Sequence, residues 1–366
     1  MRIFVDARCV RPGRTGVGTA TEAWIRALAE SHPEDQLTVL ILSRSPSERF
    51  FGPNIHLLAT RVDYEWHPLA ELYSHWLLPR LAARTRAQVF WGPAFAVPST
   101  PAPFPRVVTV HDLSVFDHPS DYPPAFGAYL RWRIQRAVRA ADGIHCVSHD
   151  TRQRIAARWP ETAKKCRVIP CGVDDFFFAD SPVSDPFPPL PNFFILTVGA
   201  GQPRKNAQFG AEIVRLLRAK FRLPCEYVVV GHDASLPPWV HQYPVRAKRE
   251  LVPFYKRAAL LLMPSTHEGF GIPALEAMAA GCPVAVSNRG AMPEVVGDAA
   301  VLIFALEDGP EKAAARLAEI FQDKDLIETK RELGRKRAYE FTWRSSAIAL
   351  RQFFEDLVQK KEAGRG

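Results

Sequence analysis

Short, continuous runs of apolar residues recur along the first half of the chain, with segments of helical spacing between several of them. The first run, Arg2–Val10, is followed by a glycine-rich turn and the helical segment Thr21–Glu30. Strands of a parallel sheet are buried on both faces and therefore read as continuous rather than alternating apolar runs. Further strands are predicted at Leu37–Ser43, Ile55–Thr60, Ala87–Gly92, Arg106–Asp112, Gly143–Ser148 and Cys166–Pro170.

The proline-rich segment Asp180–Asn192 interrupts this alternation. Five of its thirteen residues are proline, which neither a helix nor an interior strand accommodates, so it is predicted to be a stiff linker. The alternation then resumes and ends in a helical tail from Glu311, in which Phe341–Gln359 has one apolar face. The strands predicted here are Phe193–Gly199, Cys225–Gly231, Ala259–Ser265, Pro283–Asn288 and Ala300–Phe304.

The pattern predicts an α/β protein with two doubly wound, Rossmann-like domains. They cover 1–179 and 193–340, with the linker over 180–192 and a C-terminal helix over 341–366 that returns toward the first domain. A length of 366 residues also fits two domains better than one. Ligands bind at the carboxyl ends of the strands in such sheets. The two domains are therefore expected to face a central cleft that holds a nucleotide-sized ligand.

Composition narrows the class of partner. The chain is 47% hydrophobic and carries a formal net charge of +8, which suits phosphorylated ligands, anionic lipid or nucleic acid. It contains no RNP motif, zinc-finger spacing or long basic tract, so nucleic acid is not expected. The start lacks the apolar core of a secretory signal and no stretch is apolar enough to span a membrane, so a cytoplasmic protein is expected. The six cysteines form no CxxC pair and are predicted to be reduced and buried.

The stretch EGFGIPALEAMAAGCPV places two carboxylates, Glu268 and Glu276, eight positions apart. A helix is predicted to begin near Pro273, because proline suits the first helical position. Gly269 and Gly271 allow close approach of a ligand, and the N-terminus of the helix offers N–H groups to an anion. Two carboxylates beside an anion site suit a phosphorylated polyol. The alternative is that both glutamates only complement the helix dipole.

Two further constellations lie at predicted strand ends. Arg204 and Lys205 follow the strand that ends in Gly199, and adjacent cations there suit a diphosphate, although a solvated pair is the alternative. His111 ends a strand of the first domain and is expected to face the ligand, although it could be a hydrogen-bonded structural histidine.

The stretch TGVGTATEAW is an incomplete G-x-G-x-x-G, because Thr21 occupies the third glycine position. This motif alone is therefore weak support for a dinucleotide-binding fold.

The segment from Glu250 to Ile303 resembles the donor site of the retaining GT-B glycosyltransferases of family GT4. Glu268 and Glu276 match the E-x7-E pattern of that family. The resemblance implies that Glu268 holds the hydroxyls of the donor sugar and that Glu276 holds the ribose hydroxyls of the nucleotide. The backbone from Gly269 through Phe270 and Gly271 to Ile272 would complete the contacts to sugar and phosphate.

The resemblance also implies roles for the other constellations. Arg204 and Lys205 would bind the donor diphosphate and steady it as it leaves. His111 would lie beside the reacting sugar, orient a hydroxyl and support the developing oxocarbenium charge. Gly16 and Gly18 would let the backbone pass close to the donor phosphate or the acceptor. The catalytic residues expected on this basis are His111, Lys205 and Glu268.

The activity that the resemblance implies is transfer of a hexose from a nucleotide diphosphate sugar to a hydroxyl of a saccharide or lipid-linked saccharide, with retention. MRIFVDAR and HDLSVFDHP look most like bacterial mannosyltransferases of O-antigen or exopolysaccharide synthesis, so GDP-mannose is the first choice of donor. A UDP-sugar donor stays open, as do a phosphorylase, an NDP-sugar epimerase and a noncatalytic sugar-nucleotide-binding protein.

No cofactor and no metal are expected, because Arg204 and Lys205 can supply the cations that a departing diphosphate needs. The D-x-D formed by Asp323 and Asp325 lies in a charged helical stretch and is predicted to be solvated surface.

The helical segment Ala125–Asp142 is basic and aromatic. It could lie against anionic lipid headgroups, which would place the protein at the cytoplasmic face of a membrane, or it could be an ordinary surface helix. The arginines concerned are Arg131, Arg133, Arg136 and Arg139.

Overall fold

The computed structural model describes residues 1–11, 15–45, 48, 50, 52–63, 68–179 and 189–364. The chain divides into two compact units, the first formed by Met1–Cys171 with Trp343–Gly366 and the second by Gly172–Thr342. Most of the predicted linker, residues 180–188, lies outside the described residues.

The first unit contains a parallel sheet, as the continuous apolar runs predict. Among the described residues it has seven strands in the order β3-β2-β1-β4-β5-β6-β7. Its central strands are buried at almost every position, which is why their sequences do not alternate. The strands are β1 (Arg2–Asp6), β2 (Gln36–Leu42), β3 (Ile55–Thr60), β4 (Val89–Gly92), β5 (Arg106–Val110), β6 (Gly143–Cys146) and β7 (Cys166–Val168).

The glycine-rich turn predicted after the first strand is shorter than expected, because Gly16 and Gly18 belong to the first turn of helix α1. Thr15 caps this helix by accepting a hydrogen bond from the backbone N–H of Gly18. The helices of this unit are α1 (Gly16–Ser31), α2 (Pro68–Leu72), the π-helix η2 (Tyr73–Leu77), α3 (Leu78–Arg84), α4 (Ser114–Asp117), α5 (Pro124–Ala140), α6 (His149–Arg158) and α13 (Trp343–Ala363), with short 3-10 turns at Pro119–Asp121 and Pro160–Lys165.

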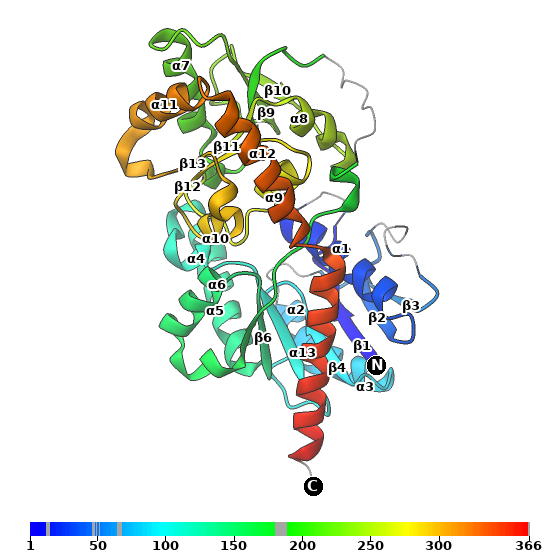
Figure 1. Cartoon of the computed structure of the whole chain (residues 1–366). Coiled ribbons are helices and arrows are strands. Elements are labelled where there is room, and N and C mark those ends of the chain that lie inside the picture. The colour runs from blue at the N-terminus through cyan, green and yellow to red at the C-terminus, as the bar shows by residue number, and fades with distance from the viewer. Residues whose placement is uncertain are drawn as a thin grey trace. The chain divides into compact units, whose positions relative to one another are not determined.

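The C-terminal helix α13 belongs to the first unit and packs against α1 (Figure 1). The indole rings of Trp24 and Trp343 meet edge to face with centroids 5.6 Å apart. Arg351 donates to the buried carboxylate of Asp35, which also holds the terminal ammonium group of Met1. The two ends of the chain are thus joined through one buried carboxylate.

The second unit contains a parallel sheet of six described strands in the order β10-β9-β8-β11-β12-β13. The chain proceeds from β8 toward one edge and from β11 toward the other, so the loops after these two neighbouring strands diverge. Such a topological switch point is where open α/β sheets bind ligands. The strands are β8 (Phe194–Val198), β9 (Glu226–Val230), β10 (His241–Tyr243), β11 (Leu260–Met263), β12 (Val284–Ser287) and β13 (Leu302–Phe304).

Helices α7 and α11 share one apolar core with this sheet, in which Tyr227, Leu262 and Leu317 are fully buried. The six cysteines are free thiols, of which four are buried as predicted, while Cys9 and Cys166 are half-buried. The helices of this unit are α7 (Ala207–Ala219), α8 (Val252–Arg257), α9 (Ile272–Ala279), α10 (Met292–Val296), α11 (Gly309–Ile320) and α12 (Lys324–Tyr339), and its 3-10 turns are η5 (Asp175–Phe177), η6 (Pro203–Lys205), η7 (Lys248–Leu251), η8 (Gly297–Ala299) and η9 (Leu306–Asp308).

Candidate functional site

Arg204 and Lys205 lie in the loop that follows β8, where they form the short turn η6. Gly199 at the end of the strand has a φ of +89°, and a Cβ there would lie 3.3 Å from Cε of Lys205. Glycine therefore both permits this backbone conformation and leaves room for the lysine chain. The Arg204 carbonyl accepts a hydrogen bond of 2.8 Å from the backbone N–H of Thr266, which ties this loop to the one after β11.

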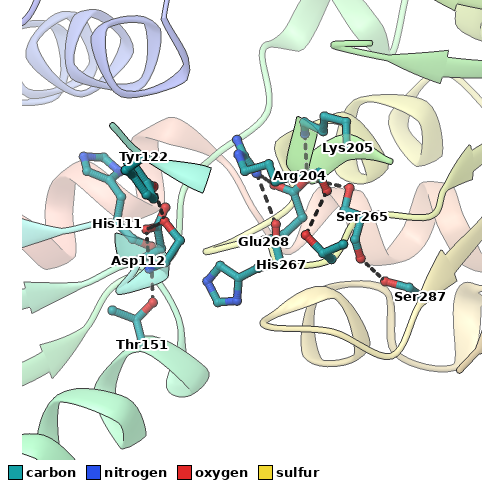
Figure 2. Close-up of polar contacts among 12 residues, drawn as sticks. His111, Asp112, Tyr122, Thr151, Arg204, Lys205, Ser265, His267, Glu268 and Ser287 are labelled. Carbon is teal, nitrogen blue, oxygen red and sulfur yellow. Dashed lines mark hydrogen bonds and ion pairs between the residues drawn. The ribbon is translucent and has the colours of Figure 1, made fainter. Parts of the chain in front are cut away.

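Both cations converge on the carboxylate of Glu268 (Figure 2). Lys205 Nζ lies 2.6 Å from Oε1, and Arg204 Nη1 lies 2.7 Å from Oε2. Ser265 Oγ also donates to Oε1 at 2.8 Å. Glu268 and Lys205 are 4% and 6% exposed, whereas the Arg204 side chain is 30% exposed. Arg204 is thus the member of the group that solvent or a ligand can reach.

The two buried members influence each other's protonation. Burial alone would raise the pKa of Glu268, but the charges of Lys205 and Arg204 outweigh it and lower the pKa to about 2. For Lys205, burial lowers the pKa and outweighs the opposing effect of Glu268. With all three groups ionised, two cations face one anion, and the excess positive charge suits a phosphate ligand.

The backbone of Glu268 is fixed by the loop that follows β12. The N–H of Ala291 donates to the Glu268 carbonyl at 2.9 Å. Gly290 has a φ of +60°, and a Cβ there would lie 2.2 Å from the same carbonyl oxygen. Ser287 Oγ donates to the Ser265 carbonyl at 2.6 Å. Three neighbouring loops therefore hold one glutamate in place.

Helix α9 begins at Ile272, with Pro273 in its first turn as predicted. Gly271 precedes it with a φ of +94°, a left-handed conformation that favours glycine. The buried ring of Phe270 meets Phe341 edge to face at 5.8 Å. Gly269 is also buried. This turn brings the start of α9 next to the carboxylate that binds the two cations.

Glu276 lies farther along α9 and has a separate set of partners. Its Oε2 accepts from Tyr255 OH at 3.0 Å, and its Oε1 lies 2.7 Å from Lys248 Nζ. Lys248 also donates to Asp174 at 2.6 Å. Burial alone would lower the pKa of Lys248, but the two carboxylates outweigh it and the pKa is raised.

In the first unit, His111 directly follows β5 and is partly buried. Its Nε2 lies 2.8 Å from the carbonyl of Pro93, so this nitrogen carries the proton, and Phe95 meets the ring edge to face at 5.5 Å. Burial lowers the pKa of His111, so the imidazole is neutral near pH 7 and its Nδ1 is an acceptor. Figure 2 also shows Thr151, whose hydroxyl donates to the His111 carbonyl at 3.2 Å.

The structure brings Arg204, Lys205 and Glu268 into one group. Glu268 lies just before helix α9, whereas Glu276 lies within α9 and belongs to a separate cluster. His111, Gly16 and Gly18 belong to the other unit. Several residues of these clusters carry no local sequence signal. Most of them are distant in sequence from their partners; Ser265, three residues before Glu268, is the exception, and a single loop serine forms no motif. The residues missed are Asp174, Lys248, Tyr255, Ser265 and Ser287.

Other expectations concern metals and membranes. Asp323 and Asp325 are exposed, and Asp323 caps helix α12, in agreement with a solvated surface. Within the described residues, one group of three potential metal ligands occurs, at His32, Glu34 and Asp35, and there Asp35 already binds Arg351 and the N-terminus. None of the described helices is long and apolar enough to cross a membrane.

The fold matches that of known proteins. The chain resembles sucrose-phosphate synthase from Thermosynechococcus elongatus with a TM-score of 0.74 and 19% identity, over 98% of this chain and 100% of that one. Two α/β units with parallel sheets, matched over this whole length, define the GT-B fold of glycosyltransferases.

Sequence comparison identifies the family. Residues 14–175 match the model described as Glycosyltransferase Family 4, and residues 192–323 match Glycosyl transferases group 1. O-antigen chain mannosyltransferase B of Escherichia coli is 27% identical over 70% of this chain and 71% of its own length. O-antigen chain mannosyltransferase RfbU of Salmonella typhimurium is 26% identical over 63% and 65%. The chain belongs to the family 4 glycosyltransferases, as the E-x7-E segment predicts.

Proposed function

We propose that this glycosyltransferase transfers mannose from GDP-mannose to a hydroxyl of a saccharide or lipid-linked saccharide in bacterial surface polysaccharide synthesis. The observation that carries the proposal is the Arg204–Lys205–Glu268 group at the switch point of the second sheet, where excess positive charge lies beside the start of α9. The names of the two O-antigen mannosyltransferases support mannose as the sugar.

In this proposal the reaction needs little covalent chemistry from the protein. Arg204 contacts the diphosphate, and the buried Lys205 stabilises the charge that grows on it as the glycosidic bond breaks. Attack occurs on the face from which the diphosphate leaves, and the departing phosphate oxygen accepts the proton of the acceptor hydroxyl. Retention follows from this geometry, and the two cations replace a metal ion.

Glu268 has two roles in the proposal. It holds both cations, and its carboxylate can accept up to about four hydrogen bonds, of which Lys205, Ser265 and Arg204 use three. One acceptor position is therefore left for a sugar hydroxyl.

Glu276 binds the ribose hydroxyls in this proposal. The neutral His111 accepts a hydrogen bond from a hydroxyl of the reacting sugar through Nδ1. Backbone N–H groups from Gly269 to Ile272 contact the phosphate, as the start of a helix allows. Gly16 and Gly18 let the backbone in the first turn of α1 pass close to the donor phosphate or the acceptor.

A panel of nucleotide sugars tests the donor. Wild-type protein is incubated with GDP-mannose, UDP-glucose and UDP-N-acetylglucosamine, and both the melting temperature and the release of nucleoside diphosphate are measured. GDP-mannose is expected to raise the melting temperature most, because a ligand that binds only the folded state stabilises it by mass action. A larger shift with a UDP-sugar would mean that this UDP-sugar, and not GDP-mannose, is the donor. Release of sugar phosphate with added phosphate would indicate a phosphorylase, and isomerised donor without any acceptor an epimerase.

Lys205→Ala tests the role of the buried cation. We expect kcat to fall about 100-fold at saturating donor, as for the loss of one preorganised donor to a developing negative charge, with a smaller change in donor affinity. Lys312→Ala, which removes an exposed lysine paired with Asp308, is the matched control. Equal kcat in Lys205→Ala and wild type would refute the assignment.

The proposal also includes contact with an anionic membrane at its cytoplasmic face. Of the four arginines, Arg139 is exposed and Arg131, Arg133 and Arg136 are half-buried. Arg136 donates to Ser99. Trp132 on the same helix is 45% exposed, and the exposed aromatic ring supports the proposal.

A further inference from the structure

Two carboxylates share one ammonium group next to helix α9. Lys248 Nζ lies 2.7 Å from Glu276 and 2.6 Å from Asp174, and the side chains of the three are 14%, 3% and 8% exposed. The ring of Phe177 covers the ammonium group at 5.6 Å. Two negative charges thus face one positive charge in a nearly closed site, which suits hydrogen-bond donors better than an anion.

The carboxylate of Glu276 is held by both of its oxygens. Lys248 binds Oε1, and the buried Tyr255 donates to Oε2 at 3.0 Å. Because different groups hold the two oxygens, the plane of the carboxylate is fixed. A carboxylate has about four acceptor positions, so one remains on each oxygen. Two acceptors at a fixed separation match the two adjacent hydroxyls of a ribose.

The three charged groups come from segments that are far apart in the sequence. Asp174 precedes η5, Lys248 begins η7 and Glu276 lies within α9. Apolar side chains of similar volume often fill such a space at no loss of stability, because charges are costly to bury. The buried cluster of Asp174, Lys248 and Glu276 includes a residue of α9, the helix that follows the Arg204–Lys205–Glu268 group. Ligand recognition therefore explains this cluster better than stability does.

We infer that Lys248 is a positioning residue for the donor: together with Tyr255 it fixes the Glu276 carboxylate so that its remaining lone pairs accept the 2′ and 3′ hydroxyls of the ribose. Asp174 is the second carboxylate that holds the ammonium group, at 2.6 Å. This inference rests on the proposed function, in which Glu276 binds the nucleotide. Lys248 acts through Glu276, so its effect belongs to the recognition of ribose rather than to the diphosphate.

The test compares GDP with 2′-deoxy-GDP by titration calorimetry. Wild-type protein is expected to bind GDP about tenfold more tightly, as for the loss of one hydrogen bond to a charged acceptor. In Lys248→Met the ratio of the two affinities is expected to fall to about one, with little change in the affinity for 2′-deoxy-GDP. Lys312→Met is the matched control and keeps the wild-type ratio.

Loss of a buried cation can also impair folding, so Tyr255→Phe provides a second measurement. It removes one hydrogen bond without changing charge, and the ratio is expected to fall about threefold. For Lys248→Met, the donor KM is expected to rise while kcat at saturation is retained.

The outcomes separate this inference from the proposed function. Equal weakening of both nucleotides in Lys248→Met, with the ratio unchanged, would mean a purely structural lysine and would overturn the inference. An unchanged ratio in Tyr255→Phe would do the same. If wild-type protein binds GDP and 2′-deoxy-GDP equally, Glu276 does not contact the ribose, although glycosyl transfer from GDP-mannose stands. Failure to bind any nucleoside diphosphate would overturn both.

Discussion

At the scale of single residues, Glu268 is expected to serve stability as well as its proposed role in donor binding. It is buried, and its negative charge is matched by Lys205 and Arg204. Removing one partner of such a buried group leaves a charge without compensation, which costs more than the net contribution of the pair. Substitutions at this position are therefore expected to affect folding as well as the proposed donor binding, and a pH series isolates the effect on folding.

Glu268→Gln gives the first prediction at this scale. The folded-state pKa of Glu268, about 2, lies below the ordinary value of 4.5, so its charge stabilises the fold above pH 4.5 and this contribution is lost as the pH falls toward 2. We expect wild-type protein to exceed Glu268→Gln by about 3 kcal/mol in free energy of unfolding near pH 7, from the linkage between pKa and stability. The difference should narrow steadily below pH 4.5.

Urea unfolding at a series of pH values measures this difference. Glu319→Gln is the control, because Glu319 forms an exposed ion pair with Arg316, and such pairs contribute little. A difference between wild type and Glu268→Gln that stays constant from pH 7 to pH 3 would contradict the assigned pKa.

At the scale of elements, helix α1 gives a different explanation for the glycines of the first loop. Gly16 is exposed in the first turn, and a Cβ there would meet nothing within 4 Å. Gly18 is buried, and a Cβ there would lie 3.0 Å from the backbone oxygen of Cys9. Only Gly18 is therefore required by packing, where the helix crosses the chain that follows β1.

This contrast predicts opposite effects of the same substitution. Gly16→Ala is expected to raise the free energy of unfolding by up to about 1 kcal/mol, because alanine favours a helix over glycine. Gly18→Ala is expected to lower it by about 1 kcal/mol or more through overpacking. Thermal unfolding measures both. Equal destabilisation would contradict this packing difference within α1, and loss of turnover in a stable Gly16→Ala would support the proposed role of Gly16 near the ligand.

The elements also show what the sequence can predict. The strands from Arg2 to Phe304 were predictable because buried parallel strands are continuous apolar runs, but β10 was missed because its sequence, HQY, is not an apolar run. Pro273 and Gly271 mark the start of α9 through local chemistry. The partners of Glu276 were not predictable, because Lys248 and Tyr255 reach it only through folding over separations of more than twenty residues and neither belongs to a recognisable motif.

At the scale of the whole molecule, the net charge of +8 favours binding to an anionic surface, and helix α5 with the α2–η2 segment offers a basic and aromatic surface for it. Helix α5 packs beside the α2–η2 segment, where Tyr129 donates to Glu71. Large apolar side chains remain exposed on these elements, and two of them are tryptophans with an arginine beside the ring. The guanidinium group of Arg136 lies 5.2 Å from the ring centroid of Trp132, and that of Arg80 lies 5.9 Å from the ring centroid of Trp76. The exposed side chains are Leu72, Trp76, Leu77, Phe126 and Trp132. Aromatic rings with neighbouring cations are typical of surfaces that lie at a bilayer interface.

Vesicle sedimentation tests this surface. Wild-type protein is expected to sediment with vesicles that contain phosphatidylglycerol and much less with pure phosphatidylcholine, and added salt should weaken the binding.

Arg139→Ala should reduce the affinity about fivefold, since one basic residue contributes about 1 kcal/mol near an anionic surface. Its ion pair with Glu161 is exposed, so stability should not change. Arg316→Ala, which removes an exposed arginine from the second unit, is the matched control. Equal sedimentation of Arg139→Ala and wild type, or binding that does not depend on anionic lipid, would show that the arginines of α5 face water and that the acceptor reaches the enzyme without this contact.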